Sequence, residues 1–336
     1  MLQWGDIFIA GTGVRLGELK MTAAEAIGIG CTSKDDVEHN GQVSTVISLD
    51  DYTPDMAVVA SRNALRAAKV TPEALGAVIY GVLKNVDINN STSYIQRELN
   101  AMNAFGVEVR ASCNGLAIVE IACQRLRIQP RSRPILVTCA HKWDEEPSER
   151  WRASKKEMPG DGASAVILST KSGFARLISL VTTQDPKLAF LLAAPREFDQ
   201  HPAHSKKSAD HNRIQQEKSP ANVVQRKQAG LIRAVRQALE ESCISIENID
   251  HVVVPHLYSP LLIRETLTVG LCDLSRTTFN FARRVGHIGP GDAFAGLDYL
   301  ARRGVLKPGQ KIMIYSVGIG FTWSCAVLEV LSRPTY

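Results

Sequence analysis

One stretch of the sequence, Val107-Glu-Val-Arg-Ala-Ser-Cys-Asn-Gly-Leu-Ala-Ile-Val-Glu-Ile-Ala122, changes its hydrophobic period in the middle. Apolar and polar residues alternate before Cys113, as in a strand, and apolar residues recur at helical spacing after Gly115. The pattern predicts that Cys113 lies in a turn between a strand and a helix. A thiol at the start of a helix is close to unpaired backbone N–H groups and to the positive end of the helix dipole. Both stabilise a thiolate and can hold an oxyanion, as in a nucleophile elbow.

The composition is that of a soluble globular protein. Its 336 residues are 45% hydrophobic and 22% charged, and they are enough for two domains of about 150 residues each. We find no apolar run long enough to cross a membrane and no signal-peptide pattern at the start. The expected location is therefore the cytoplasm, with no membrane partner.

The cysteines and the charges exclude several other classes of protein. Seven cysteines are an odd number without a C-x-x-C pair, which argues against a disulfide framework and against a zinc site. The net charge of +5 is modest and its basic residues are mostly scattered. Because no basic patch is interleaved with aromatic residues, we expect no nucleic-acid partner.

The second half of the chain repeats the first. Three pairs of segments match in the same order: 64–80 with 238–254, 126–138 with 304–316, and 162–168 with 323–328. Helical patterns alternate with short apolar strands in both halves, which predicts a duplicated α/β unit with mostly parallel sheets covered by helices. The second pair projects Cys113 and Asn114 onto Gly291 and Asp292, so two strand-to-helix turns are expected to face each other.

The predicted organisation has two halves and a connection. Residues 1–183 form the half with the cysteine, residues 184–230 connect with loop and some helix, and residues 231–336 form the second half. Within the first half, the polar residues 30–41 are expected to be a loop. The connection contains His201, His204 and His211, and its polar character favours a solvated segment over a metal site.

Two further sites offer partners for Cys113, which by itself also fits a core position. His256 follows the apolar strand that starts at His251, at the carboxyl end where catalytic groups gather in α/β sheets. His287 and Asp292 belong to the glycine-rich run Gly-His-Ile-Gly-Pro-Gly-Asp. Either of them is a candidate to orient or charge His256, and a turn with a helix-start carboxylate is the alternative.

These motifs together resemble ketoacyl-acyl-carrier-protein synthase III, a condensing enzyme of the thiolase fold. The likeness covers essentially the whole chain and rests on four motifs: Ala-Ser-Cys113-Asn-Gly, Pro255-His256, Gly160-Asp-Gly-Ala163 and Gly318-Ile-Gly-Phe-Thr-Trp323. The resemblance implies an α/β thiolase fold with duplicated halves in a five-layer α/β/α/β/α arrangement. It also implies a homodimer without a metal or redox cofactor. The glycines and Asp161 of the Gly160–Ala163 run themselves predict a tight structural turn, in which Asp161 bonds backbone N–H groups.

The resemblance also implies roles for individual residues. In that family a cysteine attacks an acyl thioester, and a histidine with an asparagine decarboxylates a malonyl thioester. Cys113 and His256 match the cysteine and the histidine, but His287 stands where the family has asparagine. Together with Asp292, this is similar to the Cys-His-Asp acyltransferases that branched from synthase III in antibiotic pathways. The oxyanion would be held by the backbone N–H groups of Cys113 and Ile319.

The resemblance therefore implies an acyltransferase of secondary metabolism, for example in polyketide antibiotic biosynthesis. Its donor would be an acyl-phosphopantetheine on an acyl carrier protein or a polyketide synthase carrier domain, or an acyl-coenzyme A. Its acceptor would be a hydroxyl or amine of a sugar or aminocyclitol, which His256 activates with help from Asp292 or His287. The alternatives are a decarboxylative or carbon–carbon condensing ketoacyl synthase III and a catalytically silent partner subunit.

Overall fold

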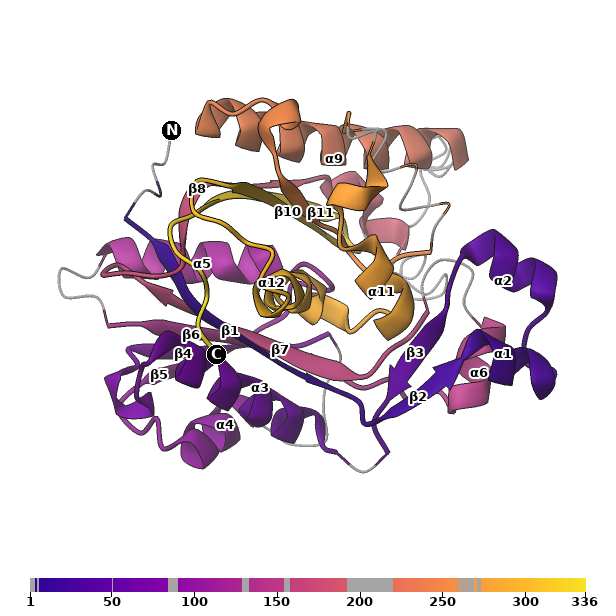
Figure 1. Cartoon of the computed structure of the whole chain (residues 1–336), viewed down its shortest axis with the longest axis horizontal. Coiled ribbons are helices and arrows are strands. Elements are labelled where there is room, and N and C mark those ends of the chain that lie inside the picture. Colours follow the sequence, from indigo (N-terminus) through magenta and orange to yellow (C-terminus); the bar gives the residue numbers. More distant parts are fainter. Residues whose placement is uncertain are drawn as a thin grey trace, which may run out of the picture.

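The computed structural model describes residues 4, 6–49, 51–83, 90–128, 133–153, 158–191, 220–258, 260, 264, 269–270 and 273–336. Within these residues, nine strands form one sheet in the order β5-β4-β6-β7-β1-β8-β11-β10-β9, and β2 and β3 form a separate pair (Figure 1). The strands of the large sheet are β1 (Phe8–Leu16), β4 (Ala77–Gly81), β5 (Phe105–Val109), β6 (Ile135–His141), β7 (Gly162–Ser169), β8 (Ala175–Gln184), β9 (His251–Val253), β10 (Lys311–Gly318) and β11 (Thr322–Val330). The small pair is β2 (Leu19–Thr22) and β3 (Ser44–Ile47).

The helices complete five layers, which confirms the expected thiolase-type arrangement. In Figure 1, α5 and α12 lie between the two halves of the large sheet, α3 and α4 cover one outer face, and α9 covers the other. The helices are α1 (Ala23–Gly28), α2 (Lys34–Asn40), α3 (Thr53–Ala68), α4 (Ser91–Leu99), α5 (Gly115–Ile128), α6 (Pro147–Ala153), α9 (Pro220–Ser242), α11 (Phe279–Val285) and α12 (Asp292–Arg302). None of the helices in the described part of the chain is long and apolar enough to span a membrane.

The core follows these layers. One cluster of buried apolar side chains packs around α5 and α12, a second packs under α3 and α4, and a third packs under α9. Strands β4 and β6 are buried along their whole length because helices cover both of their faces, which explains their nearly continuous apolar sequences. The two halves of the sheet join where Phe8 and Ile9 of β1 pair with β8.

The duplication is visible in the structure. In the first half, α3 leads through the short 3₁₀ turn Pro72–Ala74 into β4, and in the second, α9 leads through Ile246–Asn248 into β9. In the same way α5 precedes β6, and α12 precedes β10. The predicted start of the second half at residue 231 falls inside α9, which begins at Pro220. Residues 192–219 of the predicted connection lie outside the described residues.

Two local predictions were wrong. The sheet is mixed and not mostly parallel, because β7, β1, β8, β11 and β10 pair antiparallel, while parallel pairs occur at β4–β5, β4–β6 and β9–β10. Residues 30–41 are not all loop, since they contain α2. Ser33 caps this helix by accepting a hydrogen bond from the Asp36 N–H, and Gly41 ends it with φ = 72°.

Candidate active site

Cys113 lies between β5, which ends at Val109, and α5, which begins at Gly115, so the predicted strand–turn–helix is confirmed. Ser112 just before it has φ = 52°, a left-handed conformation that is unfavourable for a residue with a side chain. Such strain is typical of a sharp turn that presents a nucleophile.

Asn114 fixes this turn from the other side. Its Oδ1 accepts a hydrogen bond from the Ala117 N–H at 3.2 Å, so it caps the start of α5. Its Nδ2 donates to Thr322 Oγ1 at 3.1 Å and to Ser324 Oγ at 2.9 Å, both on β11. We predicted no role for Asn114 from the sequence, although an asparagine directly before an apolar helix is a recognisable cap signal.

The turn before α12 faces the turn before α5, as the internal repeat predicts. It follows helix α11 and the 3₁₀ turn Gly289–Gly291 and not a strand, so the expected strand-to-helix turn was wrong in the second half. A Cβ on Gly115 would lie 2.2 Å from the backbone oxygen of Pro290, two residues before Asp292. Only glycine permits this approach, because real Cβ contacts are never so short. The starts of α5 and α12 therefore meet at the centre of the molecule.

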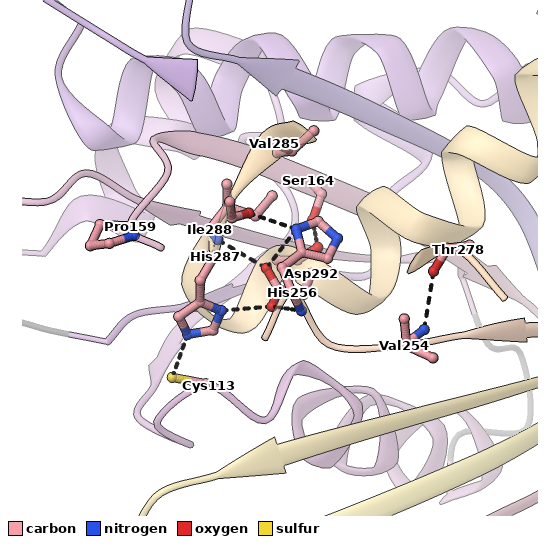
Figure 2. Close-up of polar contacts among 12 residues, drawn as sticks. Cys113, Pro159, Ser164, Val254, His256, Thr278, Val285, His287, Ile288 and Asp292 are labelled. Carbon is pink, nitrogen blue, oxygen red and sulfur yellow. Dashed lines mark hydrogen bonds and ion pairs between the residues drawn. The ribbon is translucent and has the colours of Figure 1, made fainter. Parts of the chain in front are cut away.

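At this meeting point Cys113, His287 and Asp292 form one hydrogen-bonded series (Figure 2). Nε2 of His287 lies 3.1 Å from Sγ of Cys113, and Nδ1 of His287 lies 2.6 Å from Oδ2 of Asp292. The carboxylate thus fixes the imidazole with a proton on Nδ1 and directs Nε2 at the thiol. A proton can pass directly between Sγ and Nε2.

His256 was expected to be the histidine that works with Cys113, but its ring does not contact the thiol. Its imidazole lies beyond Asp292 as seen from Cys113 (Figure 2), with Nδ1 2.7 Å from the Gly286 carbonyl oxygen and 3.4 Å from Asp292 Oδ1. The structure brings His287 to the thiol because residues 286–292 fold back over the start of α5. A bond to the Gly286 carbonyl is non-local, so the strand pattern before His256 gave no indication of it.

The electrostatics of the three buried groups favour a charged His287. Burial works against the imidazolium, but the charges of Asp292 and Cys113 and their hydrogen bonds outweigh it and raise the pKa of His287 well above its usual value. Burial also opposes an ionised Asp292, yet the two histidines and the hydrogen bonds they donate hold its pKa below its usual value. Burial lowers the pKa of His256, which is therefore neutral at pH 7.

The turn between β10 and β11 closes another side of the site. Ser316 on β10 donates to the backbone oxygen of Cys113 at 3.3 Å, and Gly318 approaches the backbone oxygen of Ala111 so closely that a Cβ would lie 2.8 Å from it. Ile319 follows Gly318 in this turn, and its side chain is largely exposed. The two residues proposed for the oxyanion site, Cys113 and Ile319, thus belong to segments that pack against each other.

Trp143 is a second contributor that sequence patterns did not indicate. Its Nε1 donates to the backbone oxygen of His287 at 2.9 Å, and its backbone N–H donates to Asp161 at 2.9 Å. Asp161 is fully buried, accepts a further backbone bond from Ser48, and pairs with Arg150 at 3.0 Å. This confirms the structural role predicted for Asp161 and shows that its turn supports the loop behind His287.

The described residues offer no metal site: no group of three or more His, Cys, Asp or Glu among them is arranged to hold an ion. The histidines of the connection, His201, His204 and His211, lie outside the described residues.

Comparisons with known proteins agree with the fold. The family model of the 3-oxoacyl-[acyl-carrier-protein (ACP)] synthase III C terminal matches residues 239–330. The beta-ketoacyl-[acyl-carrier-protein] synthase III of Methylococcus capsulatus is 26% identical over 294 residues, which cover 84% of this chain and 86% of that protein. The structure of ChlB3, described as an acyltransferase, is 28% identical with a TM-score of 0.86 and covers 98% of both chains. The synthase III of Aquifex aeolicus has a TM-score of 0.76 at 20% identity, over 96% of this chain and 99% of that one.

Proposed function

We propose that this chain, a ketoacyl-acyl-carrier-protein synthase III-like acyltransferase of the thiolase superfamily, moves an acyl group from a thioester through Cys113 to a hydroxyl or amine. The observation that carries the proposal is the position of His287, with Nε2 at the Cys113 thiol and Nδ1 at the Asp292 carboxylate. A carboxylate-supported imidazole at a nucleophile is the arrangement that activates O–H and N–H acceptors in acyl transfer.

In the first half-reaction, the Cys113 thiolate attacks the carbonyl carbon of the donor thioester while His287 carries the proton. The tetrahedral intermediate collapses with cleavage of the donor C–S bond, and His287 gives its proton to the departing thiolate. The products are an acyl-Cys113 thioester, a free donor thiol and a neutral His287. Because acylation removes the negative charge of Cys113, one of the causes that raise the pKa of His287 disappears.

In the second half-reaction, neutral His287 accepts the proton of the acceptor hydroxyl or amine through Nε2 as the acceptor attacks the acyl carbon. Asp292 stabilises the imidazolium that forms. The C–S bond to Cys113 breaks, the ester or amide leaves, and the thiolate–imidazolium pair is restored. We assign the oxyanion of both tetrahedral intermediates to the backbone N–H groups of Cys113 and Ile319, with His256 outside the reacting atoms.

The donor and acceptor that fit this proposal are those of natural-product assembly. An acyl-phosphopantetheine on an acyl carrier protein or polyketide synthase carrier domain is the proposed donor, with acyl-coenzyme A as the second choice. A sugar or aminocyclitol is the proposed acceptor. The similarity to ChlB3, which is described as an acyltransferase, supports acyl transfer as the reaction. We propose a cytoplasmic reaction, for which the reduced cysteines of the described chain are suited.

A carbon–carbon condensing synthase III is the second candidate, and the names of the sequence relatives support it. That reaction requires a neutral donor beside the histidine to stabilise an enolate after decarboxylation. Here His287 holds that position with a raised pKa and a bond to a carboxylate, so it serves as a base better than as a neutral donor. The structure thus favours O- or N-acylation.

We also propose a homodimer formed at the β5 edge of the sheet. The edge strand β5 carries Phe105, half exposed, and Met102 just before it is 69% exposed. Ile121 of α5 is exposed on the same side as Arg125, which lies over the Phe105 ring at 4.5 Å. An apolar edge strand next to exposed apolar side chains is suited to pairing with a second copy. Light scattering of the Phe105→Glu variant tests this: a monomer is expected.

The proposed reaction is tested by intact mass and discharge. The protein is incubated with acyl thioesters on carrier protein and on coenzyme A, and an adduct that disappears in Cys113→Ala is expected. The adduct is then offered either sugar and aminocyclitol alcohols or malonyl-carrier protein. Discharge by an alcohol with ester formation supports the proposal, whereas discharge by malonyl with release of carbon dioxide would establish the condensing enzyme instead.

A further inference from the structure

His256 is held rigidly beside the reacting groups without touching them. It is 2% exposed, and its ring meets the edge of Phe281 with 5.5 Å between centroids. Its Nδ1 lies 2.7 Å from the Gly286 carbonyl oxygen, so Nδ1 carries the proton and donates it. Its Nε2 is buried and has no hydrogen-bond partner among the described residues.

His256 binds two residues that position His287, namely Gly286 and Asp292. The ring of His256 holds the carbonyl of Gly286, the residue directly before His287. The backbone N–H of His256 donates to Asp292 Oδ2 at 2.9 Å, the same oxygen that His287 Nδ1 contacts at 2.6 Å. Asp292 Oδ1 accepts from the Ile288 N–H at 2.9 Å, so the carboxylate is fixed in one orientation.

The conformation of Gly286 makes this support necessary. Gly286 ends α11 with φ = 84°, and the chain turns there to bring His287 over Cys113. The Gly286 carbonyl would be unsatisfied without the His256 ring, since no other bond to it is present among the described residues. A buried carbonyl without a hydrogen-bond partner is destabilising, and a local rearrangement of the backbone would relieve that cost.

We propose that His256 is a positioning residue, which through its Nδ1–H fixes the Gly286 carbonyl and thereby aims His287 at Cys113. The proposal rests on the proposed function, in which His287 and not His256 transfers protons. A neutral His256 is suited to this task, because a second positive charge beside Asp292 would compete with His287 for the carboxylate. Burial, which lowers the pKa of His256, keeps it neutral. The charged groups that face it are Asp292 and His287.

Three substitutions separate this role from a catalytic one. Asparagine places an amide donor close to the position of Nδ1, glutamine places one close to Nε2, and phenylalanine has neither. His256→Asn is therefore expected to keep kcat close to the wild-type value. His256→Gln and His256→Phe are expected to lose kcat by about 100-fold with little change in KM, because His287 is misplaced while the binding surface remains.

The control lies on β9, the strand that precedes His256. His251 at the start of β9 is half-buried, bonds Gln310 at 3.3 Å and is remote from the site, so His251→Asn and His251→Phe are expected to keep full activity. Thermal unfolding of every variant shows whether it folds. If His256→Phe fails to fold, the two amide variants His256→Asn and His256→Gln still show whether a donor is needed at the Nδ1 or at the Nε2 position.

A readout without substrate separates failure of this inference from failure of the proposed function. Proton–nitrogen NMR of the His287 ring measures its pKa, which is expected to stay raised in His256→Asn and to fall in His256→Phe. The inference is overturned if Asn and Phe variants are equally impaired, if Gln but not Asn retains activity, or if none of the three changes kcat and the His287 pKa. If no thioester acylates the protein, the proposed function fails, and the NMR result still decides the role of His256.

Discussion

Asp292 lies five residues after His287 and its Oδ2 is 2.6 Å from Nδ1 of that histidine. The two residues flank the turn that precedes α12, so the helix start itself fixes the carboxylate against the imidazole. This short connection matters for chemistry, because it holds the pair together at Cys113. A base that is oriented from within its own turn needs no contribution from the acceptor to become active.

The first prediction concerns the carboxylate. Asp292→Asn keeps the shape of the side chain but removes the charge that stabilises the imidazolium and sets its tautomer. We expect kcat to fall about 10⁴-fold, the loss typical of this substitution in a nucleophile–His–Asp triad. The measurement is the steady-state rate of acyl transfer, with acylation followed separately by intact mass.

Asp298 is the matched control for Asp292. It lies on the same helix, is equally buried, and binds Thr12 Oγ1 at 2.9 Å and Arg302 Nε at 2.6 Å, away from the cysteine. Asp298→Asn is expected to lower stability and to leave kcat almost unchanged. Equal losses of kcat in both variants would show that the effect of Asp292 is structural.

The second prediction concerns stability as a function of pH. His287 has a raised pKa in the folded protein, so between its unfolded value of about 6.5 and its folded value the folded state binds more protons. The stability that this group contributes is present below about pH 6.5 and is lost as the pH rises through the folded pKa. His287→Asn removes it, so the advantage of wild type over the variant should shrink on going from pH 6 to alkaline pH.

Urea denaturation at several pH values measures this difference in unfolding free energy. The slope is expected to reach at most about 1.4 kcal/mol per pH unit within the window. The lowered pKa of His256 leaves it neutral in both proteins above about pH 6.5, so it adds no slope in that window. A difference that does not change with pH would contradict the raised pKa of His287.

Much of the fold was predictable because the chain repeats itself. Segments such as 64–80 and 238–254 carry the same helix, turn and strand pattern, and each pattern can be recognised from consecutive residues alone. The direction in which two strands pair cannot be predicted from consecutive residues in this way. Whether β1 runs parallel or antiparallel to β7 depends on how distant segments meet, and the apolar pattern of a doubly covered strand is the same in both cases. The mixed sheet was missed for that reason.

The site shows the same limit at the level of side chains. The turn at Cys113 and the helix-start position of Asp292 are local patterns, and both were predicted. Which of two histidines meets the thiol depends on where their rings point. His256 is turned by its bond to the Gly286 carbonyl, 30 residues away in sequence, and no motif encodes that bond.

The third prediction concerns Asn114, which sequence patterns left unassigned. Asn114→Ala removes the cap of α5 and the two hydrogen bonds to β11, so it should destabilise the protein by about 1–2 kcal/mol. The acylation rate of Cys113 should also fall, because the nucleophile turn is no longer tied to β11. Ser33→Ala removes the exposed cap of α2 and should leave acylation unchanged. An unaltered acylation rate in Asn114→Ala would restrict Asn114 to stability.

The last prediction tests the contact between the two helix starts. A Cβ on Gly115 would lie 2.2 Å from the Pro290 backbone oxygen, so Gly115→Ala must push α5 away from the turn that carries His287 and Asp292. Overpacking of this kind costs about 1–3 kcal/mol. The larger expected effect is on acylation, because the 3.1 Å contact between Cys113 and His287 spans the same gap.

Gly28 provides the control for this substitution. It is the last residue of α1, and a Cβ there would meet nothing within 4 Å. Gly28→Ala should therefore be neutral or slightly stabilising, since alanine restricts the unfolded chain more than glycine does. We would measure the acylation rate by intact mass and the urea midpoint of both variants. These values separate an effect on the site from an effect on stability alone. If Gly115→Ala acylates as fast as Gly28→Ala, the close approach of the helix starts is not what places His287 at the thiol.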